Sequence, residues 1–268
     1  MFTTLYIREL QNYLYSLRFQ VSFVIVVLVF TLGSVSFASS FKDMHDNYTK
    51  YSVAQQEAIG KQAENISKVA TARNSFIISP RENSVIADCK ESYLPNRITY
   101  SAYNVFDYSV RHDSNNPLLI RTDSLSWSFI VSMFLSFITL LFAFDAISGE
   151  KEERTLALVF SNAVPRRTFL CSKLLSIITV IGVMELVGII ISLIILAVSG
   201  QVQLNSSFLI ETAGFILISL LFITTFAVFG LLSSVVTRYS NISLLISLCF
   251  WLFAAVVIPN TSVFWAKT

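Results

Sequence analysis

The segment FDAISGEKEERTLALVFSNAVPRRTFLCSKLL, residues 144–175, joins two long apolar runs and is the most informative part of the chain. The runs cover 125–144 and 174–198. Each is long enough to cross a hydrocarbon core of about 30 Å, which takes about 20 helical residues. Between them lie a dense charge cluster at 150–154, an apolar stretch and a Pro-Arg-Arg sequence. This order predicts a short surface helix, a turn at 162–165 and a basic start to the next spanning helix.

Three further apolar runs, at 19–40, 212–236 and 242–258, raise the number of expected spans to five. The composition agrees, because 54% of the 268 residues are hydrophobic and 13% are charged, against about 25% charged in an average soluble domain. A secreted enzyme and a cytosolic binding module are thereby excluded. The net charge of +2 provides no basic field for nucleic acid. We expect an all-α polytopic membrane protein.

The orientation follows from the eight Lys and Arg residues that flank the spans on one side. They are Arg8, Arg18, Lys151, Arg154, Arg166, Arg167, Lys173 and Arg238. The loop at 199–211 has no Lys or Arg, as an outside loop should, whereas a long loop such as 41–124 translocates largely regardless of charge. The N-terminus is therefore expected in the cytoplasm and the tail at 259–268 outside. We expect a sixth span in the complete protein, which this chain would then lack; a true five-span protein is the alternative.

Residues 1–18, ahead of the first span, place their apolar side chains on one helical stripe. The stripe consists of Phe2, Tyr6, Leu10, Tyr13, Leu14 and Leu17. Such a helix can lie in the membrane interface. A plain anchoring helix without a partner is the alternative that periodicity leaves open.

The segment 145–173 resembles the motif of ABC transporter type-2 permeases, in which an Asp is followed by Gly-Glu-Lys-Glu-x-Gly-Thr-Leu, a Pro-Arg turn and Gly-Lys. The matching residues are Asp145, Gly149, Glu150, Lys151, Glu152, Thr155, Leu156, Pro165, Arg166 and Lys173. Arg154 and Ser172 stand where the family usually has Gly. Asn116, Pro117 and the following SLSWSFIVSMFLSF resemble the multicopper-enzyme maturation permease subgroup, which also has a large first external loop.

The resemblance implies a permease that pairs with a second copy or a sister permease and is driven by two cytoplasmic ABC ATPase subunits in the bacterial inner membrane. It also implies that the ATPase contacts the N-terminal helix and the segment after the second span. The corresponding residues are Arg8, Glu9, Asp145, Gly149, Glu150, Lys151, Glu152, Arg154, Thr155 and Leu156. The chain has no GxxxxGK[ST] loop and no HExxH or GxSxG motif. We therefore expect no enzyme activity and no cofactor in this chain, with ATP and Mg held by the partner.

Between the first two spans, residues 41–124 carry 20 of the 36 charges. A weak helical stripe up to about residue 72 could prolong the first span, and β-branched and aromatic alternation beyond it predicts short strands. We expect an extracytoplasmic α+β domain that gates the exit, binds substrate or recruits an external protein. The segment also holds four candidate copper ligands, Met44, His45, Cys89 and His112. Their spacing is not that of a metal site, which favours interpreting them as ordinary surface residues.

Glu185 lies midway along the third span and is the sole ionisable residue within the five runs. A carboxylate there costs about 2.5 kcal/mol or more, so it should face protein or water. Two roles stay open: a place in a translocation path or dimer interface, and a protonated, hydrogen-bonded packing residue. An intramembrane enzyme would need a second catalytic partner, which the spans lack.

Two functions follow from these observations. The first is a permease subunit of an ABC exporter. The second is an ATP-driven membrane anchor or assembly component that acts mechanically on an external protein through residues 41–124, without transport. ATP-dependent flux in reconstituted vesicles distinguishes them.

Overall fold

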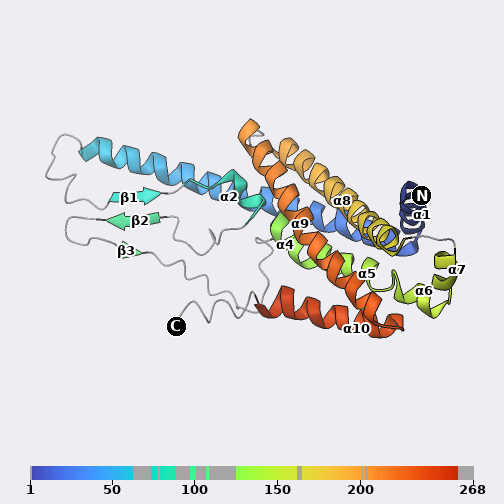
Figure 1. Ribbon diagram of the computed structural model, residues 1–268. Coiled ribbons are helices and arrows are strands. Elements are labelled where there is room, and N and C mark those ends of the chain that lie inside the picture. Colours follow the sequence, from blue (N-terminus) through green and yellow to red (C-terminus); the bar gives the residue numbers. More distant parts are fainter. Residues whose placement is uncertain are drawn as a thin grey trace. The chain divides into compact units, whose positions relative to one another are not determined.

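The computed structural model describes residues 2–62, 74–77, 79–87, 97–100, 107–108, 125–161, 165–200, 202 and 205–258. The described chain is mostly helical (Figure 1), and five of its helices are long and apolar enough to cross a membrane, as predicted. The chain forms two compact units. The first comprises Met1–Thr31, Trp127–Leu193 and Ser206–Thr268, and the second Leu32–Ser126 and Ile194–Asn205.

The helices of the first unit include the predicted interfacial helix and all five spans, two of which extend into the second unit. Their bounds are α1 Phe2–Leu14, α2 Leu17–Gln62, α4 Trp127–Ile130, α5 Ser136–Ala143, α6 Ser148–Glu152, α7 Leu156–Ser161, α8 Arg166–Ser199, α9 Ser206–Val236 and α10 Ser240–Trp251. A π-helical turn at Val131–Leu135 joins α4 to α5, and a second one at Leu252–Val257 continues α10. The predicted turn at 162–165 lies partly, and the tail at 259–268 wholly, outside the described residues.

The first spanning helix is much longer than its apolar run. The run ends near residue 40, whereas α2 continues to Gln62 and has 46 residues, which corresponds to about 69 Å. Residues 41–59 hold no Gly or Pro, so nothing in the chain stops the helix where the hydropathy falls. The expected boundary at 40 therefore marks the end of the apolar surface and not the end of the helix.

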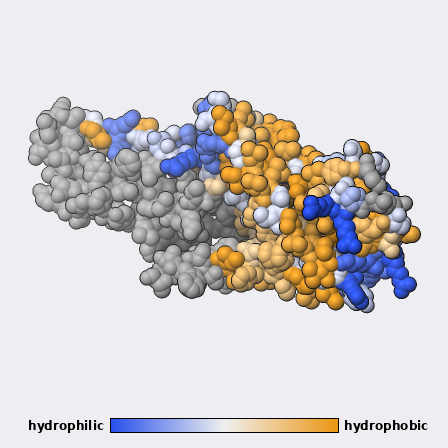
Figure 2. Space-filling model, viewed as in Figure 1, coloured by the Kyte–Doolittle hydropathy of each residue, from blue (hydrophilic) through white to orange (hydrophobic). Residues whose placement is uncertain are grey.

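The spanning helices of the first unit approach closely where one of them has a glycine. A Cβ on Gly230 of α9 would lie 2.5 Å from the Cβ of Ala143 of α5, and one on Gly188 of α8 would lie 2.5 Å from the ring of Phe30 of α2. Small residues let helices pack by direct backbone approach in a membrane. Apolar residues cover the spanning helices on the face shown in Figure 2, whereas hydrophilic residues gather at the end with α1 and α6.

The second unit contains the outer part of α2 and a small antiparallel sheet. Its strands are β1 Asn74–Ile77, β2 Arg97–Tyr100 and β3 Asp107–Tyr108, in the order β1-β2-β3. Asn74 pairs with Tyr100, and Ile98 pairs with Tyr108. These strands lie in the stretches where alternation predicted them. Whether residues 41–124 form a separate extracytoplasmic α+β domain stays a prediction.

Candidate functional site

The segment between the second and third spans begins with α6, whose first turn is held by a residue far along the chain. The hydroxyl of Ser234, near the end of α9, accepts the backbone N–H groups of Ile147 at 2.9 Å and Ser148 at 2.8 Å. Ile147, at the N-cap of α6, has no side chain that could accept these hydrogen bonds. Ser234 therefore acts as a distant helix cap and ties α6 to α9.

Lys151 strengthens the same tie at the carboxyl end of α9. Its Nζ donates hydrogen bonds to the carbonyl oxygens of Ser234 at 3.2 Å and Thr237 at 2.9 Å, and to that of Val235. The last carbonyls of a helix lack intrahelical partners and carry a partial negative charge. An ammonium group among three of these carbonyls supplies hydrogen-bond donors and also offsets their partial negative charge.

Glu152, next in sequence, holds the start of the following helix. Its Oε2 accepts the backbone N–H of Ser240 at 3.3 Å, at the first residue of α10. A carboxylate is favourable at a helix N-terminus for the same electrostatic reason that a cation is favourable at the other end. We call Lys151, Glu152 and their backbone partners at 234–240 the turn clamp, because together they hold the turn between α9 and α10.

A second set of contacts ties α6 to α1 and α8. Lys173 of α8 forms ion pairs with Glu150 at 2.7 Å and with Glu9 of α1 at 3.1 Å. Its side chain is only 4% exposed, and its Nζ lies 5.1 Å from the centre of the Phe169 ring. We call Glu9, Glu150 and Lys173 the Lys173 bridge. Since buried charges must be paired, this bridge fixes three helices to one another.

Further contacts fasten α1 and the start of α2 to the bundle. The Tyr6 hydroxyl donates to Oγ1 of Thr179 at 3.0 Å, and Arg18 pairs with Asp145 directly after α5. The Tyr13 ring packs edge-on against Phe142 at 5.7 Å. Burial, together with the carboxylates of the Lys173 bridge and of Asp145, raises the pKa of Tyr13, which therefore stays neutral.

The conformation of Arg154 explains why the family motif usually has Gly at this position. Arg154 has a φ of 62°, in the left-handed region that favours glycine, directly after α6 ends. The family's usual Gly at this position would adopt this conformation without strain. Gly149 differs: a Cβ there would meet ordinary contacts, with 3.8 Å to Cβ of Asp145 as the nearest. The backbone conformation therefore favours glycine at 154, whereas nothing among the described residues requires glycine at 149.

The ten predicted ATPase-contacting residues differ in how far they are engaged within the chain. Glu9, Asp145, Glu150 and Lys151 are engaged in contacts within the chain. Arg8 and Arg154 are exposed, Glu152 is exposed although it accepts from Ser240, and Gly149, Thr155 and Leu156 are half-buried. Leu158 of α7, which the motif does not include, exposes 68% of its surface. Contact of any of these residues with an ATPase stays a prediction.

Sequence reasoning assigned no site role to Lys173, Ser234, Ser240 or Arg18. Lys173 and Arg18 did stand out as charges next to apolar runs, and that signal could have suggested a partner inside the protein. Ser234 and Ser240 gave no such signal. Their partners lie 86 to 88 residues away in the chain.

Glu185 is completely buried between α8 and α9 of the single chain. The Ser219 hydroxyl donates to its Oε1, whereas its Oε2 has no hydrogen-bond partner among the described residues. These contacts agree with the packing role. A role in a translocation path or dimer interface stays a prediction.

The described residues contain no group of three or more His, Cys, Asp and Glu side chains that could hold a metal ion. Met44 and His45 lie on α2, whereas Cys89 and His112 lie outside the described residues. A copper site is therefore left without a described ligand set.

A comparison with protein families identifies the chain. A family profile described as "ABC-2 family transporter protein" matches residues 3–268, which is nearly the whole length and includes α1, the turn clamp and all five candidate spans. No curated protein and no solved structure matches the chain. The family profile does not distinguish the multicopper subgroup. The chain is a multi-pass membrane protein of the ABC-2 transporter family, and thus a transporter permease.

Proposed function

We propose that this chain is the permease subunit of an ABC exporter, driven by separate cytoplasmic ATPase subunits that bind ATP and Mg. The turn clamp carries the proposal. It joins α6 to the ends of two spanning helices through Lys151 and Glu152, while the Lys173 bridge joins α6 to α1 and α8. A force applied to α6 would reach four helices through hydrogen bonds and ion pairs.

The ATPase would dock on the exposed residues of α1 and of the segment with α6 and α7. Leu158 is a suitable anchor, because it is largely exposed and its helix lies in sequence between the charged clusters at 150–154 and 166–167. Buried apolar anchors surrounded by polar residues carry most of the affinity of a protein interface. In this arrangement the family motif has two tasks: its exposed residues meet the ATPase, and its internally paired residues pass the motion on.

The topology of the proposal places α1, α6 and α7 on the cytoplasmic side of a bacterial inner membrane. The short loop between the second and third spans carries five Lys and Arg residues, and such loops lie on the cytoplasmic side of the membrane. Residues 41–124 would then lie outside, as an α+β domain of which β1 to β3 are the described strands. The permease would act as a pair, with a second copy or a sister chain, and residues 41–124 would meet any external partner protein.

Co-purification with a cognate ABC ATPase, sought first among the neighbouring genes, tests the docking surface. Leu158→Ser removes the proposed anchor and should weaken ATPase retention about tenfold, which is the usual cost of a moderate interface anchor. Val53→Ser, an exposed apolar residue on α2 in the second unit, is the matched control and should have no effect. Equal retention by both variants would contradict the docking surface.

The mechanical alternative is favoured by one observation: α2 extends far beyond its apolar run and reaches Gln62. A long rigid helix could act on an external protein without any substrate crossing. Vesicles that contain the permease and its ATPase separate the two functions. Exporter activity requires ATP-dependent flux of a substrate across the vesicle membrane, whereas the alternative predicts ATP hydrolysis that responds to the external partner, with no flux.

A further inference from the structure

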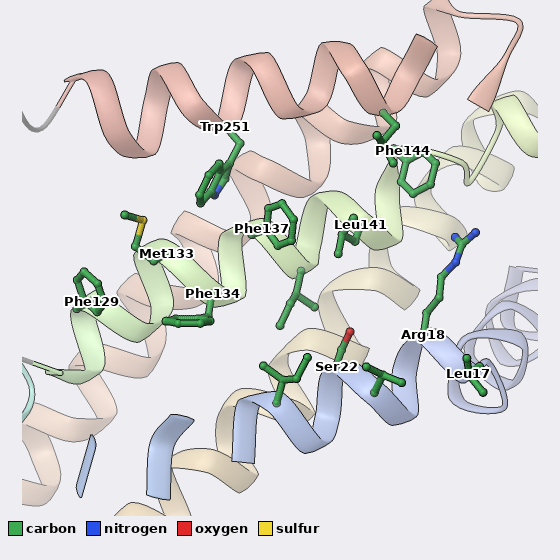
Figure 3. A pocket seen from close by; sticks show the side chains of 14 residues that line it. Leu17, Arg18, Ser22, Phe129, Met133, Phe134, Phe137, Leu141, Phe144 and Trp251 are labelled. Carbon is green, nitrogen blue, oxygen red and sulfur yellow. The ribbon is translucent and has the colours of Figure 1, made fainter. Parts of the chain in front are cut away.

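A large groove lies within the spanning region of the first unit, between α2, the α4–α5 helix and α10 (Figure 3). Its volume is about 940 Å³, near the upper end of the range for small-molecule sites. The lining is almost entirely apolar and rich in aromatic rings. Representative residues are Ile25, Phe134, Phe137, Leu141, Phe144 and Trp251.

The groove has the length of a lipid chain. Its lining follows the α4–α5 helix from Phe129 to Phe144, which corresponds to about 22 Å of helix. One leaflet contributes about half of a hydrocarbon core of about 30 Å. An acyl chain that starts at one end of the groove would therefore stay inside it for the full depth of a leaflet.

Both helices that line the groove with aromatic residues leave α-helical geometry beside it. The π-helical turn Val131–Leu135 contains Met133 and Phe134, and the turn Leu252–Val257 directly follows Trp251. The indole Nε1 of Trp251 donates to the hydroxyl of Ser136 at 2.9 Å, which fixes the ring. Such π-helical turns are rare and occur frequently at functional sites.

Arg18 lies at one end of the groove, where α2 begins (Figure 3). Its side chain is 55% exposed, and its guanidinium lies 5.4 Å from the centre of the Phe144 ring. One of its nitrogens, Nη1, pairs with Asp145. A guanidinium has five N–H donors in a fork that suits a phosphate, so a second anion can bind beside the carboxylate. The start of a spanning helix is also the depth of the lipid headgroups.

We propose that this groove is a binding site for an anionic glycerophospholipid, with the phosphate on Arg18 and an acyl chain along Phe144, Leu141, Phe137 and Phe134. In the groove the acyl chain exchanges contact with other lipids for contact with apolar side chains and is not exposed to water. The preference for this lipid over bulk lipid therefore comes mainly from the charged end of the groove. Basic pockets between spanning helices recognise anionic headgroups in this way. The site does not depend on the proposed function, because no ATPase is needed to fill it.

Trp251 gives the site an internal reporter. Phospholipids with brominated acyl chains quench tryptophan fluorescence on contact, and the difference between the wild-type chain and Trp251→Phe isolates the emission of Trp251. The full chain is reconstituted in phosphatidylcholine vesicles that contain a minor fraction of either brominated phosphatidylglycerol or brominated phosphatidylcholine. We expect the anionic lipid to reach half-maximal quenching at about one tenth of the lipid fraction that phosphatidylcholine needs. The reason is that a hydrogen bond to a charged group changes an affinity about tenfold or more.

Arg18→Gln should abolish this preference while leaving the quenching by brominated phosphatidylcholine in place. Arg167→Gln removes an exposed cation near the start of α8 and should change neither the preference for the anionic lipid nor the quenching by brominated phosphatidylcholine. Ile25→Phe, about two helical turns after Arg18 in α2, narrows the groove and should reduce quenching by both lipids. Equal quenching by the two lipids in the wild type would overturn the proposal, since bulk lipid would then fill the groove. No quenching at all would also overturn it and would assign the groove to protein, for example a second copy of the chain.

Discussion

The last turn of α9 and the turn before it are attached to the rest of the bundle in different ways. At the end, the last carbonyls receive Lys151 and the hydroxyl of Ser234 caps α6. About one turn earlier, Gly230 lets α9 lie directly against Ala143 of α5. The first attachment depends on which polar groups are present, and the second on the absence of a single methyl group.

This difference places a tightly packed contact and an exchangeable polar attachment about one turn apart on the same helix. A close glycine contact in lipid tolerates no added volume. A polar attachment at the membrane surface is exchangeable, because water or another protein can replace its hydrogen bonds. Substitutions can break each kind of attachment separately, and the expected losses differ in size and in reach.

Lys173→Met should cause the largest loss of stability, about 3 kcal/mol, because it leaves Glu9 and Glu150 without their shared cation in a mostly buried place. Thermal unfolding in detergent measures the loss. Arg167→Met, an exposed cation of the same helix, should change stability little. Combining Lys173→Met with Glu9→Gln and Glu150→Gln should restore most of the stability; a triple variant as unstable as the single one would contradict the bridge.

Gly230→Ala should destabilise the protein by about 1–3 kcal/mol, because its Cβ would lie 2.5 Å from that of Ala143. Gly214→Ala in the same helix is the matched control. Among the described residues, a Cβ there meets no atom within 4 Å, so the better helix propensity of Ala should leave stability unchanged or raise it. Similar melting temperatures for the two variants would mean that volume does not limit the α5–α9 contact.

Lys151→Gln should cost about 1–2 kcal/mol, because it removes the cation from the carbonyls at the end of α9. The loss should be local: hydrogen exchange should rise at 234–240 and stay unchanged at the Gly230 contact. Glu153→Gln, an exposed neighbour, is the control. An equal rise over the whole of α9 would contradict the separation between its last turn and the contact at Gly230.

Arg154→Gly should raise stability, by about 1 kcal/mol, because glycine adopts the left-handed conformation at 154 without the penalty of a side chain. Arg154→Ala should bring no such gain, since alanine keeps the penalty. Denaturant unfolding of both variants provides the measurement. If alanine stabilises as much as glycine, the gain comes from the lost charge and the backbone explanation fails.

The five spans could be predicted from sequence because hydropathy acts over one continuous stretch. The apolar runs at 125–144 and 212–236 correspond to α4–α5 and α9 within a few residues at most ends. The end of α2 could not be predicted in this way, because leaving the membrane does not by itself stop a helix. Hydropathy therefore locates the membrane and only capping or breaking residues locate the helix ends.

The candidate site was predictable in its location but not in its contacts. The motif at 149–156 pointed to the segment that α6 and α7 form, whereas the left-handed conformation of Arg154 was not predicted. The roles of Ser234 and Ser240 depend on partners 86 to 88 residues away. Such roles are set by helix packing, which a local pattern does not encode.

In the proposed mechanism, α6 passes motion to the α9–α10 turn through Lys151. A spin label at Tyr239→Cys, with Cys89, Cys171 and Cys249 replaced by Ser, reports on this turn because Tyr239 is exposed there. The measurement compares label mobility in vesicles that contain the partner ATPase, with and without trapped ATP. ATP should change the mobility in the wild-type background and with Glu153→Gln, but not with Lys151→Gln, although the ATPase stays bound. An unchanged label in the wild-type background, or the same ATP response with Lys151→Gln, would contradict the claim.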